Sequence, residues 1–222
     1  MTVKKEKKWI RRELRSSMNG MSSAYMRNSC LSYGLNFGVS LPDLRIIAGE
    51  HQKDRALAES LWKEDVRELK ILATMLCPAE TLSLKDALQW CAECPNQEIA
   101  DYLCGELLHH HVEAMELMQR NLLSESPFGL YIAFMLAACL CSEGKILPDS
   151  LVEALLSKGK TILDEGESKE QRAVLTAFKR FGRQSQANAA KVLNSLRGYE
   201  HCDKAEQEEF FNDLKFEFDY YR

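Results

Sequence analysis

The stretch NQEIADYLCGELL, residues 96–108, lies near the middle of the 222-residue chain and decides the fold class. Asn96 can cap a helix because its side-chain oxygen can accept a hydrogen bond from a free backbone N–H. Ile99, Leu103 and Leu107 then recur every four residues, which places them on one face of that helix. The stretch therefore predicts an amphipathic helix whose apolar face packs against neighbouring elements.

Asp101 falls one turn into the predicted helix, on the face of Gln97, Gly105 and Leu108 and off the apolar stripe. A carboxylate beside a small residue on an inner helix can reach a ligand. Aspartate is also common on solvated helix surfaces. The stretch by itself leaves both interpretations of Asp101 open.

Helix starts of the same kind recur along the chain. Capping residues stand at Asp65, Asn96, Ser126 and Ser168, at intervals of 30 to 42 residues, and each precedes an apolar run. The chain has only five prolines and eleven glycines, and no window alternates cleanly between apolar and polar residues. The pattern predicts an all-α fold, an α-α superhelix of about six HEAT- or armadillo-like helical pairs forming a curved solenoid. We expect residues 1–222 to form a single HEAT-like repeat domain without a sheet.

The expected helices follow from apolar periodicity and from the turn residues between them. Pro42 stands where a proline can open a helix, with Ser40 as a candidate cap, and Asp65 with Glu68 resembles a capping box. The expected helices cover residues 3–17, 22–33, 54–62, 65–76, 83–91, 96–108, 110–123, 126–141, 150–163 and 204–220, with a further helix opened by Ser168. In such a stack the second helices line the concave face, so we expect Asp101 there.

The distribution of charge is more informative than the net charge of −4. Residues 1–15 contain seven basic residues (Lys or Arg) and two Glu. Residues 169–197 contain seven basic residues and one Glu. Acidic residues dominate the middle helices and the final stretch. Two basic segments are compatible with a nucleic-acid partner, although solvated faces also produce charge runs.

Other features limit the location and the chemistry. No apolar run approaches the length of a membrane span, and the first twelve residues are too charged for a signal peptide. Eight cysteines are spread over helix-like segments, which is typical of free thiols in a reducing compartment. We expect a cytoplasmic monomer with no membrane partner. No nucleotide-binding, nucleophile-elbow or zinc-protease motif occurs, so no cofactor is predicted.

The sequence Cys91-Ala-Glu-Cys94, with histidines at residues 109–111, invites comparison with a zinc site. A structural zinc site usually needs a second closely spaced ligand pair alongside the first. Here the two cysteines stand at the end of one predicted helix, whereas the histidines stand at the start of the second predicted helix after it. We therefore expect these residues in the core or at its rim, and no metal site.

Residues 25–28 read Tyr-Met-Arg-Asn, and residues 37–45 contain a specific turn motif, Gly-x-x-x-Pro-x-Leu-Arg. These segments resemble the AlkD-like DNA alkylation repair family, which are DNA glycosylases built from HEAT-like repeats, and the turn motif is the most specific piece of the resemblance. Three later segments agree with the family pattern in register, namely Leu-Trp at residues 61–62, Glu-Leu-Lys-Ile-Leu-Ala at residues 68–73, and residues 96–101. The resemblance covers roughly residues 20–200, and the middle repeats match mainly in pattern.

The resemblance implies an activity and a site. The family cleaves the N-glycosidic bond of alkylated, positively charged purines. Asp101 matches the family's catalytic aspartate, and Tyr25 matches an aromatic residue of the same site. A carboxylate suits this chemistry because loss of the base makes the sugar oxocarbenium-like, and an anion stabilises that charge and can orient water.

Three positions depart from the family pattern. The family's tryptophan one turn before the aspartate is Gln97, its arginine in the following repeat is Tyr131, and its last site tryptophan aligns with Thr176. These changes remove two aromatic faces that favour a cation and one phosphate clamp. The chain therefore resembles a divergent member of the family.

Two hypotheses follow. In the first, the concave face binds duplex DNA that can carry alkylated bases, with Asp101 as the catalytic residue of a glycosylase. In the alternative, a non-catalytic solenoid binds DNA structures or a protein partner. The expected DNA-binding residues are Tyr25, Arg27, Arg45, Gln97, Tyr131, Lys179, Arg180 and Arg183, of which the five basic residues would contact phosphates.

Overall fold

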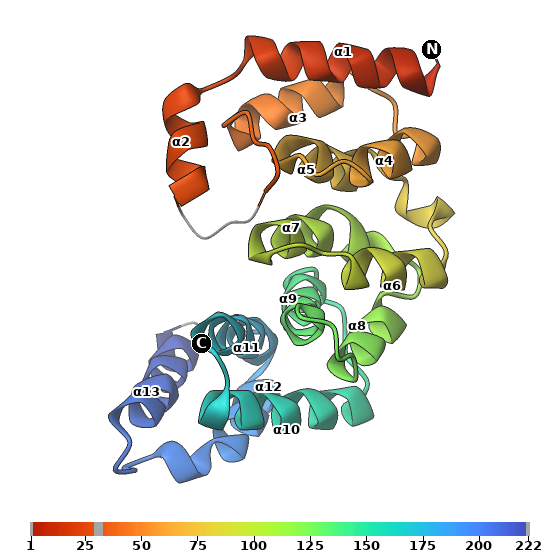
Figure 1. Ribbon diagram of the computed structural model, residues 1–222. Helices are drawn as coiled ribbons and strands as arrows, with labels where there is room; N and C mark the ends of the chain where they lie inside the picture. Colours follow the sequence, from red (N-terminus) through yellow and green to blue (C-terminus); the bar gives the residue numbers. More distant parts are fainter. Residues whose placement is uncertain (1, 29–32, 221–222) are drawn as a thin grey trace. The chain divides into compact units, whose positions relative to one another are not determined.

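The computed structural model describes residues 2–28 and 33–220, and within these ranges every regular element is a helix (Figure 1). One isolated parallel bridge joins Leu35 to Val66. The all-α prediction is therefore confirmed. The chain divides into two compact units, Met1–Val112 and Glu113–Arg222, called here the first and second units. The expectation of a single domain stays a prediction.

The first unit is built around one buried helix. Its helices are α1 (Val3–Ser16), α2 (Gly20–Asn28), α3 (Leu41–Gly49), α4 (Arg55–Trp62), α5 (Arg67–Leu76), α6 (Leu84–Ala92) and α7 (Gln97–Tyr102), with a 3₁₀ turn at Ala79–Thr81. All ten residues of α5 are buried, and α5 packs against α3, α4 and α7. Trp62 and Trp90 stack with ring centroids 4.4 Å apart, which joins α4 to α6. A helix buried on every side must pair its charged residues internally.

The helix predicted over residues 96–108 changes type along its length. Asn96 caps α7, because its Oδ1 accepts the N–H of Ile99 at 3.0 Å. The chain then continues as a π-helix, Leu103–Leu107, and a 3₁₀ turn, Leu108–His110. Ile99, Leu103 and Leu107 are fully buried, as the stripe predicts. The wider π turn rotates the following residues, so Leu108 is fully buried and does not share the half-buried environment of Asp101.

The second unit contains α8 (Ala114–Leu122), α9 (Gly129–Ser142), α10 (Asp149–Glu165), α11 (Ser168–Gly182), α12 (Gln186–Ser195) and α13 (Ala205–Tyr220), with a 3₁₀ turn at Arg197–Tyr199. Its centre is the pair α9 and α11, joined by an edge-to-face contact of Phe134 and Phe178 with centroids 6.4 Å apart. Gly159 lets α10 approach closely, since a Cβ there would lie 2.5 Å from the Phe178 ring. No helix in the described ranges has the length and apolar character to cross a membrane.

Some expected helix starts are wrong for a physical reason. Helix α5 begins at Arg67 without a side-chain cap, because Val66 and not Asp65 occupies the capping position, and the carboxylate of Glu68 is used elsewhere. Helix α9 begins at Gly129, and Ser126 instead exchanges hydrogen bonds with Ser124. The sequence pattern also missed α12, which Ser185 caps. The helix expected over residues 22–33 is α2, described over Gly20–Asn28, and residues 29–32 lie outside the described ranges.

Candidate nucleic-acid interface

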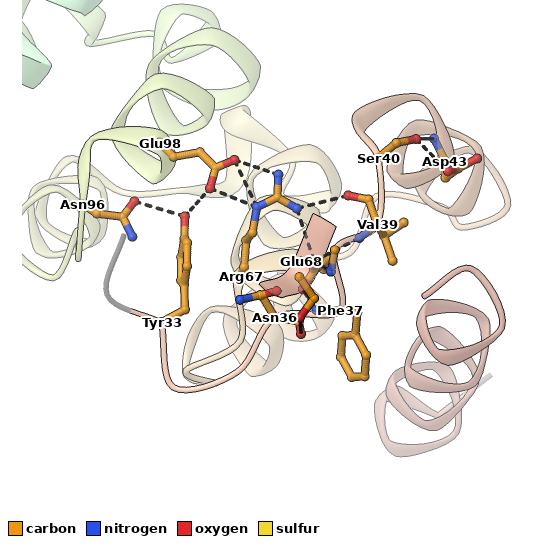
Figure 2. A network of polar contacts seen from close by, with 12 residues as sticks. Tyr33, Asn36, Phe37, Val39, Ser40, Asp43, Arg67, Glu68, Asn96 and Glu98 are labelled. Atoms are coloured by element: carbon orange, nitrogen blue, oxygen red, sulfur yellow. Dashed lines mark hydrogen bonds and ion pairs between the residues drawn. The ribbon is translucent and has the colours of Figure 1, made fainter. Parts of the chain in front are cut away.

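A buried carboxylate holds the loop between α2 and α3, residues 33–39, in place (Figure 2). Glu68 is fully buried and accepts the backbone N–H groups of Phe37 at 3.0 Å, Gly38 at 2.9 Å and Val39 at 3.3 Å. Gly38 has φ +69°, and a Cβ there would lie 2.3 Å from the carbonyl oxygen of Asn19. Only glycine fits this close approach, because any side chain would collide with the backbone.

Arg67 connects the same loop to α7. Its Nη2 donates to Glu98 Oε1 at 2.7 Å, and its Nε donates to Glu98 Oε2 at 2.9 Å. Its Nη1 donates to the carbonyl oxygen of Val39 at 3.1 Å. Only 4% of Arg67 is exposed. Burial opposes the charge of Arg67, but hydrogen bonds and charge attraction from Glu98, and then Glu68, raise the pKa of the guanidinium. Arg67 is therefore a permanent cation with two carboxylate partners.

Tyr33 joins the loop directly to α7 and to its cap. Its hydroxyl lies 2.5 Å from Glu98 Oε2 and 3.1 Å from Asn96 Oδ1. Burial, and then the hydrogen bond to Glu98, raise the pKa of Tyr33 well above the usual range, so the phenol stays protonated. The loop also binds α2, since Ser23 Oγ donates to the carbonyl oxygen of Asn36 at 3.0 Å. Helices α2, α5 and α7 are thus fixed to one another through a single loop.

The loop of residues 33–39 and its charged partners Arg67, Glu68 and Glu98 are called here the frame. The frame positions the residues predicted for the site in the first unit. Asp101 and Gln97 are both half-buried and lie four residues apart on α7, so they are neighbours on one helix face. Tyr25 is 76% exposed on α2. Arg27 belongs to α2, and its side chain lies outside the described part of the chain. The frame fixes the helices that carry Asp101, Gln97 and Tyr25.

Arg45 is paired with an acidic residue. It is exposed on α3, and its Nη2 lies 3.2 Å from Oε1 of Glu106 in the π-helical turn after α7. A carboxylate at this distance neutralises part of the charge that a phosphate would meet. Phosphate binding by Arg45 would therefore require exchange of Glu106 for the phosphate.

The remaining predicted residues belong to the second unit. Tyr131 is only 3% exposed on α9. Thr176 donates its hydroxyl to the carbonyl oxygen of Arg172 at 2.8 Å, one turn earlier in α11. Lys179 and Arg180 lie in the last turn of α11, and within residues 2–28 and 33–220 no carboxylate pairs with either. Arg183 follows that helix and pairs with Glu217 of α13. The structure thus gathers three predicted cations at one helix end.

Sequence reasoning missed the residues that build the frame. Arg67, Glu68 and Glu98 have charged side chains, and charged residues are usually expected at the surface. The available signal was the position of Arg67 and Glu68 at the start of an otherwise apolar run. Such charges must find internal partners, but the sequence does not name a partner about 30 residues away.

The cysteine pair lies in the core. Cys91 and Cys94 are both buried, and Cys94 Sγ lies 3.4 Å from the carbonyl oxygen of Asn96. Burial raises the pKa of the Cys94 thiol to about 12, so it is protonated at neutral pH. A protonated thiol packs as a small apolar group.

Comparison with known proteins identifies the fold and the family. A solved structure described as belonging to a new family of proteins, related to the HEAT-like repeat DNA glycosylases and with affinity for branched DNA structures, matches with a TM-score of 0.79. The match covers 94% of each chain at 14% sequence identity, which supports a shared HEAT-like repeat fold. No curated protein matches the sequence. The family model described as DNA alkylation repair enzyme matches residues 10–127, more than half of the 222 residues. The chain therefore belongs to the DNA alkylation repair enzyme family.

Proposed function

We propose that this protein binds DNA through phosphate contacts and prefers branched DNA to a linear duplex. The observation that carries the proposal is the pair Lys179 and Arg180, two cations in the last turn of α11 without a carboxylate partner in the described ranges. Cations of this kind supply most of the affinity of a protein for the DNA backbone. The preference for branches is suggested by the protein of similar fold, whose description gives it affinity for branched DNA structures.

The replaced site residues support binding over catalysis. Gln97 offers no aromatic face, Tyr131 is buried, and Thr176 returns its hydroxyl to its own helix. A glycosylase of this kind needs groups that favour a cationic base and hold the phosphates around it. The chain keeps neither the two tryptophans nor the arginine at these positions.

The test measures the affinity for a fluorescently labelled four-way junction and for a linear duplex as salt is raised. We expect tighter binding to the junction and a steep salt dependence, with a slope lower by about 2 in the variant K179Q/R180Q, since each lost phosphate contact removes about 0.9. The control K145Q/K158Q removes two exposed lysines elsewhere in the second unit and should bind as the unmodified protein does. Undetectable DNA binding at low salt would refute the proposal.

A second candidate function is excision of alkylated purines, and the half-buried carboxylate of Asp101 on α7 favours it. The carboxylate would stabilise the oxocarbenium-like sugar and orient the attacking water. This candidate predicts release of methylated purine from alkylated duplex DNA, with a loss of about a hundredfold in Asp101→Asn. DNA affinity should stay unchanged or rise, because the substitution removes an anion. No release by the unmodified protein would exclude excision and leave the DNA-binding proposal intact.

A further inference from the structure

Helix α1 uses one face to pack against α4. Ile10 and Leu14 are fully buried, Lys7 donates to the carbonyl oxygen of Ser60 at 3.0 Å, and Arg11 Nη2 lies 2.8 Å from Glu64 Oε2. Lys7 also pairs with Glu64. Two of the basic residues of the N-terminal segment are therefore internal contacts.

The opposite face of α1 is a row of exposed cations. Lys4, Lys8, Arg12 and Arg15 are exposed and follow one another at intervals of four, four and three residues, which places them on one helix face. Within residues 2–28 and 33–220 no carboxylate pairs with Lys4, Lys8 or Arg15, and Arg12 pairs only with the adjacent Glu13 at 3.1 Å. We call these four residues the α1 stripe. At 1.5 Å per residue it extends over about 16 Å, roughly the length of five base-pair steps.

Exposed apolar side chains follow the stripe along the chain. Met18 is 58% exposed, and Met21 at the start of α2 is 87% exposed. Both line an open hollow of about 880 Å³ between the end of α1, α2 and the start of α3. Flexible apolar side chains of this kind can cover the faces of bases that have lost their stacking partner.

The packing of α1 argues against a membrane as the partner of the stripe. A helix that lies on a bilayer inserts its apolar face into the lipid. Of the apolar residues of α1, Ile10 and Leu14 are fully buried against the protein, and Val3 and Trp9 are half-buried, with the Trp9 ring edge-on to His51 at 4.8 Å. A purely electrostatic surface beside exposed methionines fits a nucleic acid better, because nucleic acids combine a regular row of phosphates with apolar base faces.

We propose that the α1 stripe binds the phosphates of one arm of a branched DNA, and that Met18 and Met21 contact the bases at the branch point. This inference rests on the proposed function, in which Lys179 and Arg180 of the second unit bind DNA phosphates. A branched DNA has three or more arms with separate backbones, and two separate sets of cations can neutralise phosphates on two of them. A linear duplex offers no branch point for Met18 and Met21 to contact, and therefore gains less.

The experiment compares a four-way junction with a linear duplex of matched base composition. The variant K4Q/K8Q/R15Q should lose about tenfold or more affinity for the junction, with a salt slope lower by about 2 to 3, and retain its duplex affinity within about twofold. The variant M18S/M21S should weaken junction binding without a change in salt slope, because it removes no charge. The control K53Q/K63Q/K85Q removes three exposed lysines of the first unit outside α1 and α2, and should behave as the unmodified protein does.

The possible failures are distinct. Equal losses on junction and duplex, or no loss on either, would overturn the assignment of the α1 stripe while the proposed DNA binding stands. Absence of DNA binding by the unmodified protein would overturn both proposals. Vesicles of phosphatidylserine and phosphatidylcholine provide the last comparison. If K4Q/K8Q/R15Q lost binding to these vesicles while keeping its junction affinity, the partner of the stripe would be a membrane surface. Circular dichroism and thermal unfolding establish that each variant is folded.

Discussion

Arg67 and Glu98 form a two-point ion pair across 31 residues of sequence, with Nη2–Oε1 and Nε–Oε2 distances of 2.7 Å and 2.9 Å. The pair joins the start of α5 to the first turn of α7, the helix that carries Asp101. The parallel geometry of a guanidinium and a carboxylate gives such a pair directional specificity as well as energy. The candidate site in the first unit is therefore positioned by charges that are not themselves part of it.

We expect Glu98→Gln to lower the free energy of unfolding by about 3 kcal/mol, because it leaves the buried cation Arg67 without its main partner. Urea unfolding measures the change. Tyr33→Phe is the matched control, since it removes only a hydroxyl from the same carboxylate and should cost about 1 kcal/mol. A cost for Glu98→Gln below about 0.5 kcal/mol would show that the pair contributes little.

Glu68→Gln should destabilise the protein by about 3 kcal/mol, because one of the two oxygens that accept the N–H groups of residues 37–39 becomes a donor. The exposed neighbour Asp65 provides the comparison, and Asp65→Asn should change stability by less than about 0.5 kcal/mol. Chemical denaturation of both variants measures the difference. Equal effects would mean that Glu68 does not hold the loop.

Glu106→Gln should increase DNA affinity several-fold, because Arg45 would then be free to meet a phosphate and one repelling anion is lost. Fluorescence anisotropy at low and high salt measures this gain, which should diminish as salt rises. Glu116→Gln frees Arg120 in the same way on α8, outside the predicted site, and should leave affinity unchanged. Equal gains from both variants would indicate an effect of net charge alone.

The contact between α1 and α4 should weaken in acid. The hydrogen bond from Lys7, followed by the attraction of Lys7 and Arg11, lowers the pKa of Glu64. A carboxyl whose pKa is lower in the folded chain stabilises folding above its unfolded pKa of about 4.3, and this contribution is lost as pH falls through the folded pKa. Glu64→Gln should therefore cost about 0.5 to 1 kcal/mol at pH 7 and little near pH 3.

Thermal unfolding of Glu64→Gln and of the unmodified protein between pH 7 and pH 3 measures whether their stabilities converge in acid. Glu50→Gln changes an exposed carboxylate at the end of α3 and is the control. Its stability should depend on pH as that of the unmodified protein does over the whole range. A constant difference between Glu64→Gln and the unmodified protein would contradict the assigned ion pair.

Most helices of the fold were predictable because their signals are local. The caps Asp54, Ser83 and Asn96 accept hydrogen bonds from backbone groups three residues later, so a short window contains both partners. The buried stripe of Ile99, Leu103 and Leu107 follows from spacing alone. The family resemblance also rests on short motifs, and it is confirmed over residues 10–127.

The arrangement around Asp101 was decided by tertiary structure. Glu68 binds a loop 29 to 31 residues earlier, and Arg45 meets Glu106 across 61 residues. Side chains of one charge type are equivalent in a sequence window, and only the packed helices determine which of them meet. The π-helical turn Leu103–Leu107 is a further case, because it buries Leu108 where the 3.6-residue period placed it beside Asp101. The sequence by itself determined most of the helices, their apolar faces and the family. Only the tertiary structure decided which charges hold the site together and which remain exposed, since that choice depends on contacts between residues far apart in the chain.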